Sequence, residues 1–518
     1  MPNSVDFSGR PFHFIGIGGI GMSALAYVLA RRKFPISGSD IRLTHITQRL
    51  KEIGVHIFWS QDATNLEFFQ QSKDLSVGTF SSATVGITAS CGTVAETLRC
   101  NTKGKVERKS VGLPQVICST AIHPANSEYR AALDLGCPIF HRSDVLAALI
   151  QDYRSIAVAG THGKTTTSSL IGYLLLKTGL DPTIVVGGEV DAWGGNASVG
   201  QGPYLVAEAD ESDGSLAKLS AYIGVVTNVE LDHPDHYDTL DEVVETFQIF
   251  ARRCQTLVGC IDCETVRDRI KPDISYSLNP SSGACYTADC IAYGAQGTTA
   301  RIWERGKILG TLNLPLLGKH NLSNALAAVA IGRLLGLDFS AIAQALSTFE
   351  GAHRRFEVKG QYGGICFVDD YAHHPSEISA TLTAARLHVQ AQGAAQRRVV
   401  AVFQPHRYSR TLAFLEDFSQ CFGEADLVII NDIYSAGEPN LRQISGQDVA
   451  KVIGKYHPQV YYQPSLQSVH QFLNEILCPG DLALFLGAGN LNQIIPDVMA
   501  FYQNNATSSL LQKSCSCL

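Results

Sequence analysis

The stretch SIAVAGTHGKTTT (residues 155–167) joins an apolar run to a glycine turn and then to a run of threonines. This order predicts a buried strand that leads through the turn into the N-terminus of a helix. Backbone N–H groups in such a turn can face phosphate oxygens, and the helix dipole favours anions there. Lys164 would then neutralise charge on the β- and γ-phosphates, and the Thr165 hydroxyl would bind magnesium.

The spacing of the glycines departs from the common phosphate-binding loop G-x-x-x-x-G-K-[ST]. Gly160 lies only three residues before Gly163. The alternative is an ordinary helix start that follows a strand and binds no ligand. The position of the turn directly after the apolar SIAVA favours phosphate binding.

Two acidic stretches follow this loop along the chain. The run YLVAEADESD (204–213) predicts a strand that ends in carboxylates, where a second metal ligand is expected, although a solvated acidic loop would have the same composition. The next apolar run, IGVVTN, leads into NVELDH (228–233), which ends in His233. A histidine after a third strand of one sheet is a candidate metal or phosphate ligand.

The strand–turn–helix order occurs in three places, which predicts parallel sheets covered by helices. FHFIGI (12–17) precedes a glycine turn and a helical run from residue 22 to 32. SIAVAG begins the second unit. A third unit follows FEGAHRRFE (349–357), with strands expected in GICFVDD, RRVVAVFQP, ADLVIIND and DLALFLGAG. We therefore expect an α/β protein of three domains: an N-terminal Rossmann-like domain (1–152), a central P-loop ATPase-type domain (153–350) and a C-terminal Rossmann-like domain (351–518).

One segment interrupts this rhythm. Residues 71–112 are rich in Ser, Thr and Gly and end in a basic stretch. A long irregular segment inside a domain is usually an insertion or a flap, or it is disordered. The alternation in TFSSATVGITAS could instead form a hairpin.

The first glycine turn, GIGGIG (16–21), matches the dinucleotide pattern G-x-G-x-x-G, and Asp40 follows its last glycine by nineteen residues. Taken alone, the pattern suggests an NAD-dependent oxidoreductase. It reports only that a diphosphate can approach the backbone, and a UDP-sugar also carries a diphosphate. A second nucleotide site at residues 160–167 makes hydride transfer the weaker hypothesis.

The composition limits the class of protein. The chain has 518 residues, 45% of them hydrophobic and 17% charged, which is typical of a soluble globular protein. The net charge of −7 argues against non-specific binding of nucleic acid. The N-terminus lacks a signal-peptide pattern and no apolar run reaches membrane-spanning length, so we expect a cytoplasmic protein without a membrane partner.

Fourteen cysteines are scattered along the chain. In a cytosolic enzyme most are expected to be reduced core residues. The densest group, residues 254–290, contains one C-x-x-C but no second close pair, so zinc is a weak alternative there. The last four residues, CSCL, match the letters of a prenylation pattern, but no polybasic stretch supports this interpretation.

Eleven ordered blocks resemble the Mur ligase family over nearly the whole chain. They are HFIGIGGIGMS, SGSD, STAI, AGTHGKTTT, EADESD, TNVELDH, LGKHNLSNALAA, RRFE, DDYAHHP, FQPHRYSRT and GAGN. Two features depart from the family pattern: the segment 71–112, and Asn490 where an aspartate is expected.

The resemblance implies that ATP and Mg²⁺ are the cofactors, with Lys164, His233 and Arg355 as catalytic residues. The implied metal ligands are Thr165, Glu208 and His233. The implied ATP-binding residues lie in the glycine turn and in three later blocks: Gly160, Thr161, His162, Gly163, Lys164, Thr165, Thr166, His320, Asn321, Asn324 and Asp370. An ordinary amphipathic helix is the simpler interpretation of HNLSNALAA.

The resemblance also implies where the substrates bind. The UDP-sugar would be held by the first glycine turn and the acidic residue after it: Gly16, Gly18, Gly19, Gly21 and Asp40. The incoming amino acid would be held by Tyr371, His373, Arg407 and Arg410. Without the resemblance, surface salt bridges would be the preferred interpretation of the two arginines.

The activity implied by the resemblance is ATP-dependent ligation of L-alanine to the lactyl carboxylate of UDP-N-acetylmuramate, which is a step of peptidoglycan precursor synthesis. A carboxylate is a poor electrophile, so we expect ATP to convert it to an acyl phosphate, with release of ADP and phosphate. The alternatives are a related ligase that adds a preformed peptide to the same UDP-sugar, an NAD-dependent oxidoreductase, and a nucleotide-sensing module without catalysis.

Overall fold

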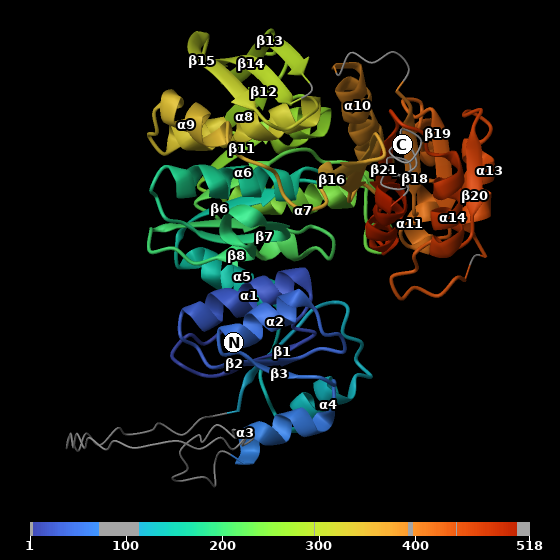
Figure 1. Cartoon of the computed structure of the whole chain (residues 1–518). Helices are drawn as coiled ribbons and strands as arrows, with labels where there is room; N and C mark the ends of the chain where they lie inside the picture. The colour runs from blue at the N-terminus through green and yellow to red at the C-terminus, as the bar shows by residue number, and fades with distance from the viewer. Residues whose placement is uncertain (1–3, 72–112, 295, 392–396, 442, 505–518) are drawn as a thin grey trace, which may run out of the picture. The chain divides into compact units, whose positions relative to one another are not determined.

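Three sheets carry the fold (Figure 1). The computed structural model describes residues 4–71, 113–294, 296–391, 397–441 and 443–504. Residues 72–112 lie outside this range, and with them the expected insertion and its alternative hairpin. The chain divides into two compact units, residues 1–142 and 143–518, which are described separately.

The first unit contains a five-stranded parallel sheet in the order β3-β2-β1-β4-β5. Its strands are β1 (Phe12–Ile15), β2 (Ile36–Ser39), β3 (His56–Phe58), β4 (Gln115–Cys118) and β5 (Ile139–His141). The helices are α1 (Ile20–Arg31), α2 (His45–Glu52), α3 (Glu67–Gln71) and α4 (Ser127–Asp134), and α5 (Arg142–Gln151) leads into the second unit. All four residues of β1 are buried, as its apolar sequence predicts.

The second unit begins with a ten-stranded sheet in the order β15-β14-β13-β12-β11-β10-β6-β9-β7-β8. Its strands are β6 (Arg154–Ala159), β7 (Thr183–Val190), β8 (Gly195–Ser198), β9 (Tyr204–Glu208), β10 (Ile223–Val226), β11 (Thr256–Cys260), β12 (Ile274–Ser277), β13 (Tyr286–Gly294), β14 (Gly297–Glu304) and β15 (Lys307–Leu314). The strands from β7 to β13 in this order are parallel, whereas β14, β15 and β8 are antiparallel to their neighbours.

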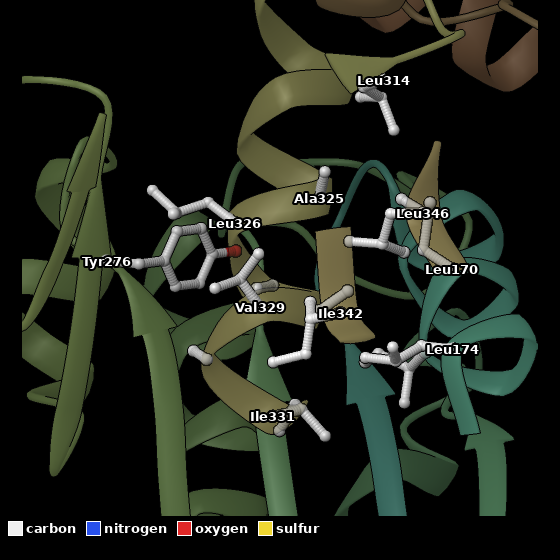
Figure 2. Packing of buried hydrophobic residues seen from close by; sticks show 14 of the residues in the cluster. Leu170, Leu174, Tyr276, Leu314, Ala325, Leu326, Val329, Ile331, Ile342 and Leu346 are labelled. Carbon is white, nitrogen blue, oxygen red and sulfur yellow. The ribbon is translucent and has the colours of Figure 1, made fainter. Parts of the chain in front are cut away.

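The helices of this part are α6 (Lys164–Lys177), α7 (Leu240–Arg253), α8 (Lys319–Leu334) and α9 (Phe339–Leu346). Helix α6 is buried from Thr165 to Leu175, because it packs against strands and against α8 and α9. Figure 2 shows side chains of α6, α8 and α9 in this core, which also includes Tyr276 of β12. A Cβ atom at Gly332 of α8 would lie 2.8 Å from Ile342 Cδ1, so the glycine permits the close approach of α9.

The last part of the second unit has a six-stranded sheet in the order β16-β17-β21-β18-β19-β20, parallel except for β16. Its strands are β16 (Glu357–Tyr362), β17 (Ile365–Asp370), β18 (Val399–Phe403), β19 (Leu427–Asn431), β20 (Val460–Gln463) and β21 (Leu482–Leu486). The helices include α10 (Pro375–Ala391), α11 (Tyr408–Ala413), α12 (Leu415–Gln420), α13 (Gly446–Ile453) and α14 (Leu466–Ile476). Apolar clusters on both faces of this sheet form its core.

The predicted α/β class with three sheet-containing domains is confirmed. The antiparallel strands β14, β15 and β8 were not predicted, because no strand–turn–helix signal marks them. In the described part of the chain, no helix has the length and hydropathy to cross a bilayer.

Candidate active site

The glycine turn after β6 has the backbone that the sequence predicts. Gly160 and Gly163 have φ values of 140° and 80°, in the left-handed region that favours glycine. Gly163 is the N-cap of α6, and a Cβ atom there would lie 2.7 Å from Asn324 Oδ1. The turn therefore lies against α8, which carries the predicted ATP-binding residues His320, Asn321 and Asn324.

Thr161 anchors this turn to the segment that follows β10, a neighbouring strand of the sheet. Thr161 Oγ1 accepts a hydrogen bond from the backbone N–H of Glu230 at 2.9 Å, and the Thr161 N–H donates to the Asn228 carbonyl at 3.0 Å. Thr166, in the first turn of α6, is buried. The loop is thus fixed by the segment that follows β10.

The Lys164 ammonium group is held by a carboxylate and a backbone carbonyl. Its Nζ donates to the Gly160 carbonyl at 2.7 Å and to Glu211 Oε1 at 2.8 Å. Burial alone would lower the pKa of Lys164, but Glu211 and Asp210 outweigh it and raise that pKa. The lysine is therefore a fixed positive charge at the loop. Glu211 was not assigned a role from the sequence, although it lies in the EADESD block.

Thr165, Glu208 and Arg355 come together beside the lysine. Thr165 Oγ1 donates to Glu208 Oε1 at 3.2 Å, and Arg355 Nη2 donates to Thr165 Oγ1 at 3.4 Å. The other Glu208 oxygen accepts from the Gly187 N–H at 2.7 Å. Burial raises the pKa of Glu208, against the nearby charge of Lys164. A hydroxyl and a carboxylate side by side are oxygen ligands of the kind that Mg²⁺ prefers.

His233, the third predicted metal ligand, lies near the same Glu211 oxygen that binds Lys164. Its Nε2 is 3.6 Å from Glu211 Oε1, and its φ of 56° is unusual for a residue other than glycine. Arg410 Nη2 lies 3.3 Å from His233 Nδ1. The structure thus places His233 between the lysine's carboxylate partner and one of the predicted amino-acid-binding arginines.

Both of these arginines have carboxylate partners after β10. Arg410 Nε donates to Asp232 Oδ1 at 2.9 Å, with 5% and 6% of the two side chains exposed. Burial alone would raise the pKa of Asp232, but the Arg410 guanidinium and the neighbouring histidines together outweigh it and hold that pKa well below its usual range. Arg407 Nη1 donates to Asp235 Oδ2 at 2.7 Å and lies 3.4 Å from Glu438. Asp232 lies in the TNVELDH block, but its pairing with Arg410 was not predicted from the sequence.

A row of aromatic rings leads away from Arg410, whose Nη1 lies 3.5 Å from His406 Nδ1. The Tyr371 ring is 5.5 Å from that of His373, which is 5.8 Å from that of His406. The Arg354 and Arg355 guanidinium groups lie 4.9 Å and 5.2 Å from the Tyr371 ring. Burial lowers the pKa of His373 to about 4, so its imidazole is neutral at pH 7.

Asp370, at the end of β17, holds two loops in place. Its carboxylate accepts from the Phe356 N–H at 2.6 Å and from the Ala372 N–H at 2.8 Å. Burial raises its pKa to about 6. These bonds orient the segments that carry Arg355 and Tyr371, so the predicted nucleotide ligand also has a positioning role.

The remaining predicted nucleotide residues lie at the start of α8. Asn321 Nδ2 donates to the Leu317 carbonyl at 2.8 Å, which secures the turn before the helix. Burial lowers the pKa of His320 to about 4. A neutral imidazole next to the phosphate loop suits contact with an uncharged base.

His162 joins the phosphate loop to α10. Its Nε2 lies 3.4 Å from Glu230 Oε2, and its Nδ1 lies 3.3 Å from Glu377 Oε1. Burial alone would lower the pKa of His162, but the two carboxylates raise it to about 10. Among the described residues, His162, Glu230 and His374 form the one group of three whose potential metal-ligating atoms lie within 4.8 Å of one another. None of the cysteines is part of this group.

The first unit holds the other glycine turn. The Gly16 N–H donates to the Ser39 carbonyl, and the Gly18 N–H donates to Asp40 Oδ2, both at 2.8 Å. Gly19 is the N-cap of α1, and Gly21 lies in its first turn. All five residues predicted to hold the UDP-sugar therefore lie together where β1 and β2 end.

Family models match three consecutive stretches of the chain. They are described as the catalytic domain of the Mur ligase family (residues 11–154), the Mur ligase middle domain (158–332) and the Mur ligase glutamate ligase domain (354–489).

Curated relatives match the chain almost from end to end. A UDP-N-acetylmuramate–L-alanine ligase of Nostoc punctiforme is 64% identical over 97% of this chain and 98% of its own. The enzyme of the same name from Trichodesmium erythraeum is 62% identical, with the same coverage of both chains.

Solved structures share the fold. A UDP-N-acetylmuramate-alanine ligase from Thermotoga maritima is 25% identical, covers 96% of this chain and 99% of its own, and has a TM-score of 0.74. A murein peptide ligase from Psychrobacter arcticus is 20% identical with the same coverage and a TM-score of 0.66, which shows the fold alone.

Proposed function

The chain belongs to the Mur ligase family, and we propose that it joins L-alanine to the lactyl carboxylate of UDP-N-acetylmuramate while ATP is cleaved to ADP and phosphate. It is an ATP-dependent carbon–nitrogen ligase of peptidoglycan synthesis. Relatives with more than 60% identity over nearly their whole length support this choice of substrates.

The reaction needs an activated carboxylate. Direct attack of an amine on a carboxylate would expel oxide, whereas an acyl phosphate releases phosphate. In our proposal the carboxylate attacks the γ-phosphoryl group of ATP in the glycine turn. Lys164 stabilises the charge that moves to the β-phosphate, and Arg355 stabilises the transferred group. The observation that carries the proposal is the assembly of Lys164, Thr165, Glu208 and Arg355 at the start of α6.

Thr165 and Glu208 would hold Mg²⁺, because their oxygens already lie 3.2 Å apart at the phosphate loop. When bound, the ion would neutralise charge on the ATP phosphates. His233 is proposed as a further metal ligand beside Glu211. The predicted ATP contacts of His320, Asn321, Asn324 and Asp370 are retained in the proposal.

We propose that the UDP-sugar binds at the first glycine turn with Asp40, in a domain that covers residues 1–152. The central domain (153–350) would bind ATP, and the third (351–518) would bind the amino acid. Tyr371, His373, Arg407 and Arg410 would hold L-alanine. An arginine fork matches the geometry of its carboxylate, although Asp232 and Asp235 must then share or release their guanidinium partners. The expected location is the cytoplasm, and the expected partners are the three small-molecule substrates.

The test is release of ADP from ATP in the presence of UDP-N-acetylmuramate and one amino acid at a time. L-alanine should be preferred over glycine by about 10-fold, because one methyl group contributes ~1–3 kcal/mol of discrimination. Leucine and glutamate should be poor substrates on steric grounds. Efficient use of either would overturn the alanine assignment, and use of a preformed peptide instead would favour the related ligase.

A further inference from the structure

The two carboxylate oxygens of Glu377, in the first turn of α10, contact different groups. Oε2 accepts hydrogen bonds from the backbone N–H groups of His373 at 3.0 Å and His374 at 3.3 Å. These bonds satisfy free N–H groups at the helix start, as a glutamate in this position often does. Oε1 points elsewhere, toward His162 Nδ1 at 3.3 Å.

His162 is held on its other side by a second carboxylate. Its Nε2 lies 3.4 Å from Glu230 Oε2, which also accepts a hydrogen bond from Ser376 Oγ at 2.8 Å. The His162 and His374 rings are 4.7 Å apart. Two direct contacts, with His374 and Glu377, thus join His162 to residues 374–377, and Glu230 links it indirectly to Ser376.

A proton, rather than a metal ion, fits this cluster. With a carboxylate at each ring nitrogen, the pKa of His162 is raised to about 10 against the effect of burial, which favours the protonated ring. His374 Nδ1 accepts from the Ser376 N–H at 3.3 Å, which places the proton of a neutral ring on Nε2. In the cluster, His162 therefore forms an ion-pair bridge between two carboxylates.

We propose that Glu377 is a positioning residue that couples the phosphate loop to the segment 371–374, so that binding of ATP and binding of L-alanine strengthen each other. The proposal rests on the roles given above to the loop and to His373. Phosphates in the loop would fix the backbone and ring of His162, and the ring would fix Glu377. Glu377 in turn holds the backbone of His373, one of the proposed L-alanine-binding residues.

A single substitution separates the coupling role from the helix cap. In Glu377→Gln the amide oxygen can still accept the N–H groups of residues 373 and 374, because Gln serves as well as Glu in this position. The negative charge opposite His162 is lost. If Glu377 only caps the helix, the substitution should leave the coupling between ATP and L-alanine binding unchanged. If Glu377 couples the two sites, the substitution should weaken that coupling.

Glu242→Gln is the matched control. Glu242 occupies the equivalent position in the capping box of α7, where it accepts from the Asp238 N–H at 2.8 Å. It is exposed and has no role in the proposed site. Its substitution should reproduce any general cost of replacing a capping glutamate.

The measurement is calorimetric binding of the non-hydrolysable analogue adenosine 5′-(β,γ-imido)triphosphate with Mg²⁺ and UDP-N-acetylmuramate, with and without saturating L-alanine. In the wild type and in Glu242→Gln, L-alanine should tighten analogue binding at least about 5-fold, the lower end of usual coupling between sites. In Glu377→Gln the effect should fall below about 2-fold.

Three results would overturn the proposal: wild-type coupling in Glu377→Gln, no coupling in the wild type, or coupling that requires added Zn²⁺ and is lost with a chelator. The last would assign the cluster to a metal ion. Failure of the wild type to bind the analogue at all would instead contradict the proposed nucleotide site.

Discussion

At the scale of single residues, neighbouring protein groups hold the charges of the proposed site in place. Lys164 is held by Glu211 and by the Gly160 carbonyl, and Arg410 is held by Asp232. Groups fixed in this way need little reorganisation when charge moves in the reaction. Electrostatic stabilisation of the transferred phosphoryl group is therefore the main contribution that we expect from these residues.

Lys164→Ala tests this expectation. Turnover should fall by roughly 100-fold or more, as when one preorganised charge is removed from a transition state. The measurement is kcat for ADP release, together with the melting temperature to show that the variant folds. Lys177→Ala, at the exposed end of the same helix, is the control and should keep wild-type kcat. Near-normal turnover by a folded Lys164→Ala variant would refute the role of the lysine.

The sequence predicted which segments carry these residues but not which partners they find. Lys164 and Thr165 follow from their place after a glycine at a helix start. Glu211, Asp232 and Glu377 could not be assigned, because their partners lie far away in the sequence: Lys164 at the start of α6, Arg410 in α11 and His162 in the glycine turn. A carboxylate that pairs across the fold has no local signal, since spacing along the chain does not report it.

At the scale of elements, apolar runs bounded by glycine turns predicted most of the parallel strands. The strand expected at 155–160 is β6, and the run DLALFLGAG contains β21. The antiparallel strands β14 and β15 escaped prediction, because they are joined by tight turns without an intervening helix. Hairpins of this kind extend the edge of the central sheet. They lack the strand–turn–helix order on which the prediction depended.

The contact between the phosphate loop and α10 should give stability a characteristic pH dependence. The pKa of His162 is raised from 6.5 to about 10 by Glu230 and Glu377, against burial. Because the pKa of His162 is higher in the folded than in the unfolded state, the protonated imidazole stabilises the folded protein. This stabilisation is complete below pH 6.5 and is lost as the pH rises through about 10. His162→Gln should therefore be less stable than the wild type near pH 6, and the difference should shrink toward pH 10.

The measurement is the melting temperature of both proteins across this pH range. At the acidic end the difference should be at least ~2–4 °C, the shift that ~1 kcal/mol gives in a domain of this size. His470→Gln, on α14, is the control for loss of a histidine outside the cluster. A difference that stays constant with pH would show that the His162 charge does not contribute to stability.

At the scale of the whole molecule, the chain divides chemical tasks among its sheets. One glycine turn lies where β1 and β2 end, and the other follows β6. The proposed amino-acid residues lie after β17 and β18. This placement follows the general rule that ligands bind at the carboxyl ends of parallel strands. The order of three such units was predictable from sequence, whereas the extent of each sheet was not.

The central claim is that ATP activates the lactyl carboxylate before the amine attacks. The most direct measurement uses UDP-N-acetylmuramate labelled with oxygen-18 in that carboxylate, together with ATP, Mg²⁺ and L-alanine. If the carboxylate attacks the γ-phosphoryl group, one labelled oxygen passes to the phosphate that the amine later displaces. The account predicts released phosphate that carries one oxygen-18 atom per turnover. Unlabelled phosphate would contradict it, because the γ-phosphoryl group would then have been transferred to water.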